Sequence, residues 1–468
     1  MNKGAAVVDE RQQTPPMYGA LAGLVAGGVA VTTGMLVAGI LDVVSPIDAV
    51  GSEFIDRVPP WLKDLAIRWF GTNDKIALRT GIIIVLGIAA LIVGYLSTRW
   101  KIAGVIGIGA FGLIGAIAAW HRPDASIGAA LPSLIGAAVG IPLLNWLVHP
   151  TRPQDIERPT RSRVPLGWDR RRFLVSTGTA AAGALVAGGI AQVLESRRIQ
   201  SIREAIPDSL PSAAASTGSG IQVPSDATLS PVTPFITPAG DFYRIDTALS
   251  FPRINLSSYK VDIAGMVDKP LTFTYDDLLA MPQIERIVTL CCVSNEVGGD
   301  LISTASFQGV LLAPLLQQAG VQSGAQQVYS TSLDGWTCGF PVEVALDGRD
   351  AMIALGMNGA ALPLEHGFPA RLVVPGLYGY VSATKWLRTI ELTTWDAEEG
   401  FWVPRGWARD APIKTQSRID VPRANKHIPA GPTKIAGIAW AQHRGVQKVE
   451  VRIDDGPWQE AKLGNDVT

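Results

Sequence analysis

The hydrophobic residues of this chain are concentrated near its N-terminus, in long runs that carry few charges. Each run can cross a bilayer core of about 30 Å, which takes roughly 20 residues of helix. The runs lie at residues 18–41, 78–97, 102–120, 126–148 and 173–194. From residue 241 onward the composition is that of a soluble globular domain. The pattern therefore predicts an N-terminal transmembrane α-helical bundle of about five helices, in contact with membrane lipid, followed by a soluble part.

Small residues recur inside these runs at helical spacing. The fourth run contains Gly136-x-x-x-Gly140, and the third contains glycines at 104, 107, 109, 112 and 115. Lipid tails are as apolar as leucine, so membrane helices associate by close packing, and small residues permit it. We therefore expect these helices to pack closely together.

The charged loops between the runs indicate an orientation. Residues 99–101 and 149–172 are basic, whereas the loop at 42–77 is slightly acidic. Because basic loops stay in the cytoplasm, the N-terminus and both basic segments are expected there. Everything after residue 195 then lies outside, which predicts a multi-pass protein of the bacterial cell membrane with an extracytoplasmic soluble domain.

The segment before the fifth run contains a twin-arginine pattern. Arg170-Arg171-x-Phe173-Leu174 precedes an Ala/Gly-rich, weakly hydrophobic stretch, which resembles a twin-arginine export signal. The alternative is an ordinary stop-transfer helix with basic flanks. Since no small-x-small cleavage site follows cleanly, we expect this helix to remain as an anchor.

The soluble part begins after a linker and alternates short strands with helices. The segment "YKVDIAGMV" reads as a strand, and "TFTYDDLLAMP" as a helix with Thr274 as N-cap and Asp277 completing a capping box. Mixed short elements of this kind indicate an α+β domain. The predicted organisation is a four-helix transmembrane region at 1–150, a basic cytoplasmic loop with the twin-arginine-like motif and fifth helix at 151–195, a flexible linker at 196–240, the α+β domain at 241–425, and a further segment at 427–468.

Composition excludes several classes of protein. The formal net charge is −1, so the chain lacks the excess of basic residues that is typical of nucleic-acid-binding proteins. Three cysteines, two of them adjacent, do not make a disulfide framework, and no zinc-type spacing or phosphate-binding loop occurs.

The adjacent cysteines occur in "RIVTLCCVSNEVGGDL", residues 286–301. The β-branched run before them predicts a strand that ends at the thiols. Successive side chains on a strand face opposite sides, so one thiol can face the core while the other faces a site. Taken alone, the pair is better explained as two buried small hydrophobic residues, and only the rest of the chain favours a site.

The segment 241–425 resembles the molybdopterin domain of the sulfite oxidase family. The family pattern Thr-Leu-x-Cys-x-x-Asn matches Thr289, Leu290, Cys292 and Asn295, which makes Cys292 the metal-binding thiolate and leaves Cys291 in the core. Further matches are "FYRIDTALSFP", which contains Arg244, and the block 357–387, which contains His-Gly-x-Pro-x-Arg. The segment 435–463 resembles the start of the family's C-terminal immunoglobulin-like dimerisation domain. The resemblance thus implies a partial domain at 427–468 and leaves a homodimer open, because the oligomeric state cannot be argued from so short a part of that domain.

The resemblance implies a Mo-molybdopterin cofactor, and the residue types suit it. Molybdenum takes soft sulfur ligands, and one thiolate on a strand end would complete the pterin's two sulfurs. His366, Arg371 and Lys385 are expected to supply cations for the pterin phosphate. By resemblance the cofactor-binding residues also include Tyr243, Arg244, Asn295, Ser332, Asp334, Ala383 and Thr384, and the catalytic residues are Cys292, Arg244, Trp407 and Arg405.

Three positions depart from the sulfite-oxidising members of the family. Val297 stands in place of a second arginine, Trp407 in place of a catalytic tyrosine, and Asp246 in place of a histidine. Because an oxyanion needs clustered cations, we expect two-electron oxygen-atom transfer with a substrate other than sulfite, in either direction. Val297 and Trp407 would form apolar walls around a small oxygen donor or acceptor.

The electron partner is expected to be a separate cytochrome or quinone system. His121 and His149 are the two histidines near the membrane helices, and the predicted topology puts them at opposite ends, about 30 Å apart. They cannot ligate one haem. A second reading of the whole chain is a non-catalytic membrane-anchored binding or receptor protein that keeps the sulfite oxidase fold.

Overall fold

The computed structural model describes residues 14–59, 61–62, 65, 69–70, 74–123, 125–149, 170–213, 232–423, 426–442 and 444–464. The chain forms two compact units. The helical unit comprises the chain up to Ile199 together with Ala248–Arg253, and the mixed unit comprises Gln200–Thr247 and Ile254 onward. Most of the predicted basic loop and the centre of the predicted linker lie outside the described residues.

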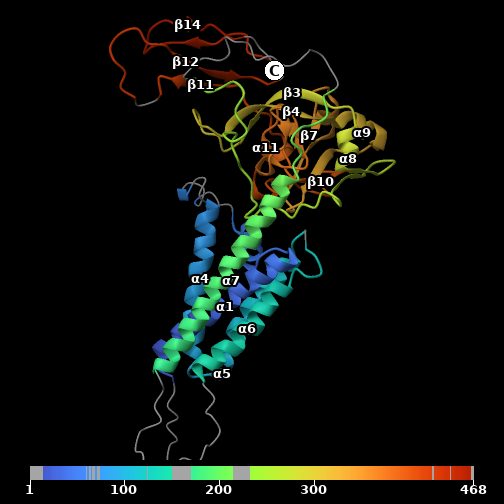
Figure 1. Cartoon of the computed structure of the whole chain (residues 1–468). Coiled ribbons are helices and arrows are strands. Elements are labelled where there is room, and N and C mark those ends of the chain that lie inside the picture. The colour runs from blue at the N-terminus through green and yellow to red at the C-terminus, as the bar shows by residue number, and fades with distance from the viewer. Residues whose placement is uncertain are drawn as a thin grey trace, which may run out of the picture. The chain divides into compact units, whose positions relative to one another are not determined.

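The helical unit is built from long apolar helices (Figure 1). They are α1 (Pro16–Leu41), α4 (Asp74–Ser97), α5 (Lys101–Trp120), α6 (Leu131–Val148) and α7 (Arg170–Glu204), with the shorter α2 (Pro46–Arg57) after α1. Among the described residues, five helices are long and apolar enough to cross a membrane, and these are the five that the sequence predicted.

Two of these helices have ends that differ from the sequence prediction. Residues 126–130 form turns, and α6 begins only at Leu131, since Pro132 lacks an amide donor and is best tolerated in a first turn. At the other end, α7 continues to Glu204, beyond the predicted limit at 194. Its charged last turns use good helix formers, including a Glu195–Arg198 ion pair at 2.6 Å.

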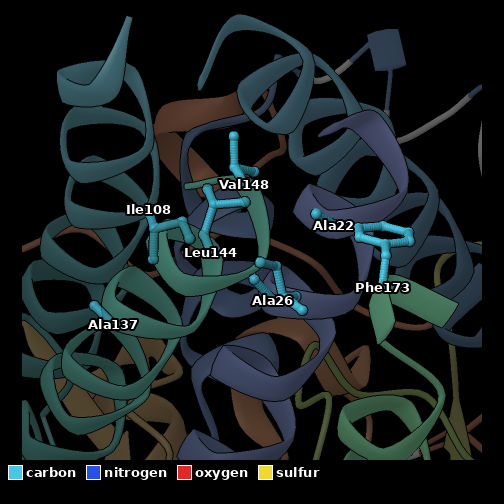
Figure 2. Close-up of a cluster of buried hydrophobic side chains, with 8 residues drawn as sticks. Ala22, Ala26, Ile108, Ala137, Leu144, Val148 and Phe173 are labelled. Carbon is cyan, nitrogen blue, oxygen red and sulfur yellow. The ribbon is translucent and has the colours of Figure 1, made fainter. Parts of the chain in front are cut away.

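Small residues allow the helices of this unit to approach closely. A β-carbon built on Gly140 of α6 would lie 2.8 Å from Cβ of Ala30 on α1, and one on Gly112 of α5 would lie 2.6 Å from Cβ of Ala137. Figure 2 shows the surrounding cluster, in which Leu144 and Phe173 pack beside alanines. The predicted close packing through small residues is therefore confirmed.

The mixed unit contains two five-stranded sheets. The first has the order β2 (Leu271–Thr274), β1 (Lys260–Gly265), β10 (Leu387–Thr393), β5 (Gln327–Ser332), β6 (Thr337–Pro341), with β1 and β10 parallel. The second has the order β3 (Ile284–Cys291), β4 (Ile302–Leu311), β7 (Met352–Met357), β8 (Ala360–Ala361), and β9 (Arg371–Val373) also pairs with β7. The helices are α8 (Tyr275–Ala280), α9 (Leu312–Ala319), α10 (Val342–Leu346) and α11 (Gly379–Ser382), with 3-10 turns η3 (Leu364–His366) and η4 (Val403–Arg405). This is the predicted α+β fold.

Local signals in the sequence place several of these elements. Thr274 caps α8, and Asp277 bonds back to it in a complete capping box, as predicted. Helix α9 ends at Gly320, whose φ of 72° suits a residue without a β-carbon. Ahead of β1, Thr237 donates its amide to the carbonyl of Thr304 on β4 at 2.7 Å. Part of the segment predicted as linker thus packs on the mixed unit.

The C-terminal segment forms two small sheets. β11 (Gln416–Val421) pairs with β12 (Ala436–Trp440), and β13 (Glu450–Val451) pairs with β14 (Gln459–Glu460). Within the described residues neither sheet gains a third strand. The immunoglobulin-like domain therefore stays a prediction.

Candidate functional site

The two adjacent cysteines separate onto different sides of the end of β3. Cys291 is the last residue of the strand and is 0% exposed, whereas Cys292 is partly exposed. The loop that follows is closed by backbone bonds: the Cys292 amide donates to the Leu301 carbonyl at 2.9 Å, and the Asn295 amide donates to the Cys292 carbonyl at 3.0 Å. The side-chain carbonyl of Asn295 accepts from the Leu301 amide at 2.9 Å. Asn295 thus fixes the loop, and Cys292 is the thiol that a ligand can reach.

Burial keeps both thiols protonated in the absence of a cation. It raises the pKa of Cys291 to about 12. Burial also raises the pKa of Cys292, although hydrogen bonds from Ser294 oppose this shift. Within the described residues, no group of three or more His, Cys, Asp or Glu could hold a metal. Because Cys291 is fully buried and Cys292 is partly exposed, a metal at this site would take Cys292 as its thiolate, and the charge of the metal would favour the deprotonated form.

A glycine brings α11 close to the cysteine strand. A β-carbon on Gly379 would lie 3.6 Å from the hydroxyl oxygen of Tyr243 and 3.9 Å from the Cys291 carbonyl oxygen. Burial raises the pKa of Tyr243 well above its ordinary value, and the nearby Cys292 thiol adds to the shift. Tyr243 therefore remains a neutral phenol that can donate a hydrogen bond beside Cys292.

Arg371 supplies a buried guanidinium to the same region. It lies on β9, is 5% exposed, and donates from Nη1 to the His366 carbonyl at 3.1 Å. Burial lowers its pKa to about 10, so it stays charged at neutral pH. Its Nε has no hydrogen-bond partner among the described residues. A buried charged donor of this kind is suited to an anionic ligand such as a phosphate.

Lys385 forms a buried ion pair that the sequence did not reveal. Its Nζ lies 2.6 Å from Oδ2 of Asp246 and donates to the Glu365 carbonyl at 3.2 Å. Arg244 donates from Nε to the same Asp246 oxygen at 2.9 Å. Burial lowers the pKa of Lys385 to about 8, against the opposing effect of Asp246. In the sequence Asp246 is only a departure from the family pattern, whereas in the structure its carboxylate contacts both Arg244 and Lys385.

His366 differs from the expectation of a fixed cation. It is 4% exposed, and its Nε2 donates to the Ala239 carbonyl at 2.8 Å. Burial, followed by the charge of Arg371, lowers its pKa to about 4. His366 is therefore neutral near pH 7, and Arg371 and Lys385 carry the positive charge of this cluster.

The residues on the β5–β6 turn and after α11 are largely occupied by structural contacts. The hydroxyl of Thr384 lies 2.7 Å from that of Ser330 and 3.1 Å from Sγ of Cys338, so this hydroxyl is engaged within the protein. Ser332 is buried and accepts from the Asp334 amide at 3.4 Å. Burial raises the pKa of Asp334, which lies near Asp246 and Lys385. Ala383 is half-buried at the end of α11.

Aromatic rings gather beside α11. Trp407 stacks on Trp402, with ring centroids 4.3 Å apart, and meets Tyr380 of α11 edge-on at 4.9 Å. Arg405 lies over the Phe401 ring, 3.7 Å from its centroid, and donates to the Phe401 carbonyl. Trp407 can therefore form part of an apolar wall, and Arg405 belongs to the same aromatic group. Val297 is 98% exposed and does not form the wall expected of it.

The two histidines near the apolar helices lie at opposite ends of α5. His149 contacts the Ser97 carbonyl at 2.9 Å, just before α5 begins, and His121 directly follows α5 and contacts Glu53 at 3.0 Å. The 20 residues of α5 span about 30 Å. These two side chains cannot bind one haem between them, as the sequence indicated.

Comparisons with known proteins agree with the site. The model of the oxidoreductase molybdopterin binding domain family matches residues 248–402. Mitochondrial sulfite oxidase of Homo sapiens is 32% identical over 271 residues, which is 49% of this chain and 49% of that protein. The uncharacterised oxidoreductase YuiH of Bacillus subtilis is 33% identical over 153 residues, 33% of this chain and 74% of that protein.

Other similarities extend over smaller or more divergent parts. The NADH nitrate reductase of Solanum lycopersicum is 31% identical over 35% of this chain and 21% of its own length. The sulfane dehydrogenase SoxCD of Paracoccus pantotrophus superposes with a TM-score of only 0.44, at 27% identity, over 57% of this chain and 74% of that chain. The chain spans about half the length of the mammalian sulfite oxidases that it matches. From the family model and the match to YuiH, the chain belongs to the sulfite oxidase family of molybdopterin-dependent oxidoreductases, which use Mo-molybdopterin.

Proposed function

We propose that this protein is a membrane-anchored enzyme in which Cys292 is the protein ligand of molybdenum, and that it acts on a small neutral or organic substrate outside the cytoplasm. The observation that carries the proposal is Arg371, which is 5% exposed and whose Nε has no hydrogen-bond partner among the described residues. A thiol for a soft metal and a buried donor for a phosphate are the two features that this cofactor requires.

The residues around the site can divide the work of holding the cofactor. Arg371 and Lys385 offer charged donors to the phosphate, and Tyr243 offers a neutral hydroxyl beside Cys292. Gly379 lets the backbone come close to a flat ring. When bound, the cofactor supplies two-electron oxygen-atom transfer. The protein supplies the thiolate, the charge balance and the exclusion of water.

Two observations favour a substrate less anionic than sulfite. Arg244 and Lys385 share the carboxylate of Asp246, so their positive charges are partly balanced within the protein. Trp407 presents an aromatic surface beside Tyr380 and α11. We propose a sulfoxide, an N-oxide or a similar small oxygen donor or acceptor, since such a molecule needs fewer cations than an oxyanion.

Metal analysis of the full-length protein, purified in detergent from cells able to make the cofactor, tests the proposal most directly. We expect about one molybdenum per chain, since the site offers one thiolate. Protein without molybdenum would favour a non-catalytic binding role. Turnover of the loaded protein on sulfite, an organic sulfoxide and an amine N-oxide then tests the substrate. Sulfite oxidation with kcat/KM of about 10⁴ M⁻¹s⁻¹ or more would contradict the substrate class.

The location of the mixed unit is part of the same proposal. The apolar helices suit a multi-pass membrane anchor, and a separate cytochrome or quinone would exchange electrons with the site. If the twin-arginine motif directs export, replacing Arg170 and Arg171 by Lys should leave a reporter fused near residue 220 on the cytoplasmic side. Unchanged outward placement of that reporter would mean that α7 crosses by the ordinary route.

A further inference from the structure

The C-terminal segment contacts the cysteine loop near both of its ends. From β11, Arg418 donates Nη1 to the carbonyl of Gly299 at 2.7 Å, near the end of the loop. Two residues after β12, Gln442 donates Nε2 to the carbonyl of Thr289, three residues before Cys292. The strands β11, β12 and β3 all belong to the mixed unit. The C-terminal segment that contains Arg418 and Gln442 therefore contacts the chain both before and after Cys292.

The same segment also fixes the backbone that leads to α11. Oε1 of Gln442 accepts from the amide of Gly376 at 2.6 Å. The Ile413 amide donates to the carbonyl of Gly376 at 2.8 Å, so both backbone groups of this glycine are held. Gly376 has φ of 87°, a conformation that a side chain would disfavour. Gln442 thereby ties β3 directly to the turn that precedes Gly379.

Arg418 is itself held rigidly before it reaches the loop. Its Nε lies 2.6 Å from Oδ1 of Asp420, and its Nη2 donates to the Thr233 hydroxyl at 2.9 Å. The side chains of Arg418 and Asp420 are each 10% exposed. A planar guanidinium fixed by a carboxylate and a hydroxyl has little freedom left, so its bond to Gly299 constrains the loop.

We propose that Arg418 and Gln442 are positioning residues that hold the Cys292 loop against the turn before α11, and so set the place of the thiolate relative to Tyr243. The inference rests on the proposed role of Cys292 as metal ligand. It gives the C-terminal segment a part in the site that is separate from any role in dimerisation. Groups that orient a ligand from outside the first layer of contacts typically change activity by about 10–100-fold when removed.

The test uses the full-length protein in detergent, with Gln442→Leu and Arg418→Met as disrupting variants. Gln459→Leu and Arg452→Met are matched controls, because both residues are exposed in the same C-terminal segment. In the loaded protein we expect the disrupting variants to lower kcat by about 10–100-fold while KM changes little, and to alter the Mo(V) electron paramagnetic resonance spectrum. Arg418→Lys, which keeps a charged donor, should recover part of the activity.

A measurement on the metal-free protein separates this inference from the proposed function. In that form the disrupting variants should speed maleimide labelling of Cys292 by about tenfold or more, with a Cys292→Ser background identifying the labelled thiol. Control-like labelling, kcat and spectrum in both disrupting variants would overturn the inference. Accelerated labelling in a protein that never acquires molybdenum would support the positioning role of Arg418 and Gln442 but contradict the role of Cys292 as metal ligand. If a disrupting variant does not fold, Gln442→Glu, which keeps the acceptor for Gly376 but not the donor to Thr289, serves for the same measurements.

Discussion

The helical unit and the mixed unit differ in the kinds of side chain that each buries in its interior. In the helical unit the buried cluster consists of alanines, aliphatic residues and Phe173, and helices approach each other across glycines. The mixed unit also has an apolar core, and in addition it buries the side chains of Arg371, Lys385 and Asp246 around its site. The first arrangement is sensitive to added volume, and the second to a change of charge. Substitutions of matched size or matched charge should therefore affect the two units differently.

The largest effect is expected at the cysteine pair. Cys292→Ser should lower molybdenum-dependent activity by about three orders of magnitude or more, because an alcohol is a poor ligand for a soft metal site. Cys291→Ser should keep most of the activity, since Cys291 is fully buried in the strand. Molybdenum content and turnover of the two purified variants provide the measurement. Equal losses of molybdenum and activity in the two variants would show that Cys292 is not the sole cysteine needed to bind the metal.

Arg371 should have opposite effects on cofactor binding and on the stability of the metal-free chain. Arg371→Met should lower molybdenum content about tenfold or more, because a phosphate would lose a buried charged donor. In the metal-free protein the same change should be neutral or stabilising by about 0–2 kcal/mol, since it removes a buried charge whose Nε has no described partner. Metal analysis of Arg371→Met and Arg371→Lys checks the expected loss of molybdenum, and melting curves of the metal-free variants check the expected change in stability. Strong destabilisation of the metal-free Arg371→Met protein would show that the charge is balanced internally.

His366 should make the metal-free protein sensitive to acid. Its pKa is lowered to about 4 in the folded state, chiefly by burial, whereas an unfolded histidine titrates near 6.5. The unfolded chain therefore binds the proton first, and stability of the order of 2–3 kcal/mol is lost as the pH falls from about 6.5 through 4. His366→Gln should flatten this part of the pH dependence, measured by melting temperature between pH 4 and 7. His427→Gln is the control, because His427 is exposed, and it should leave the slope as in the original protein.

The smallest effect is expected in the helical unit. Gly140→Val places a side chain where Cβ of Ala30 would lie 2.8 Å away, and overpacking of this kind costs about 1–3 kcal/mol. Gly28→Val is the matched control, because among the described residues no atom outside the adjacent backbone of its own helix lies within 4 Å of a β-carbon built there. Protease resistance of the helices in detergent should fall only for Gly140→Val, while molybdenum content should be unchanged in both. A loss of molybdenum in Gly140→Val would show that the two units are not independent in this respect.

The sequence by itself determined the class of each unit and the elements that depend on neighbouring residues. Apolar runs predicted the five long helices, the capping box of Thr274 predicted α8, and strand alternation allowed one buried and one accessible cysteine. These features depend on local periodicity, which needs no knowledge of distant contacts. The cysteine motif and the blocks around it led to the family because each is a short stretch of neighbouring residues that can be compared directly.

Only the tertiary structure decided the electrostatics and the long-range contacts of the site. Burial lowers the pKa of His366 and so makes it neutral near pH 7. Folding brings the Thr384 hydroxyl against that of Ser330 and pairs Asp246 with Lys385, which lies 139 positions further along the chain. Gln442 reaches Thr289 across 153 positions. A pKa depends on desolvation and on charges brought near by folding, and a contact across such separations depends on how the sheets stack. Neither is encoded in the spacing of residues along the chain.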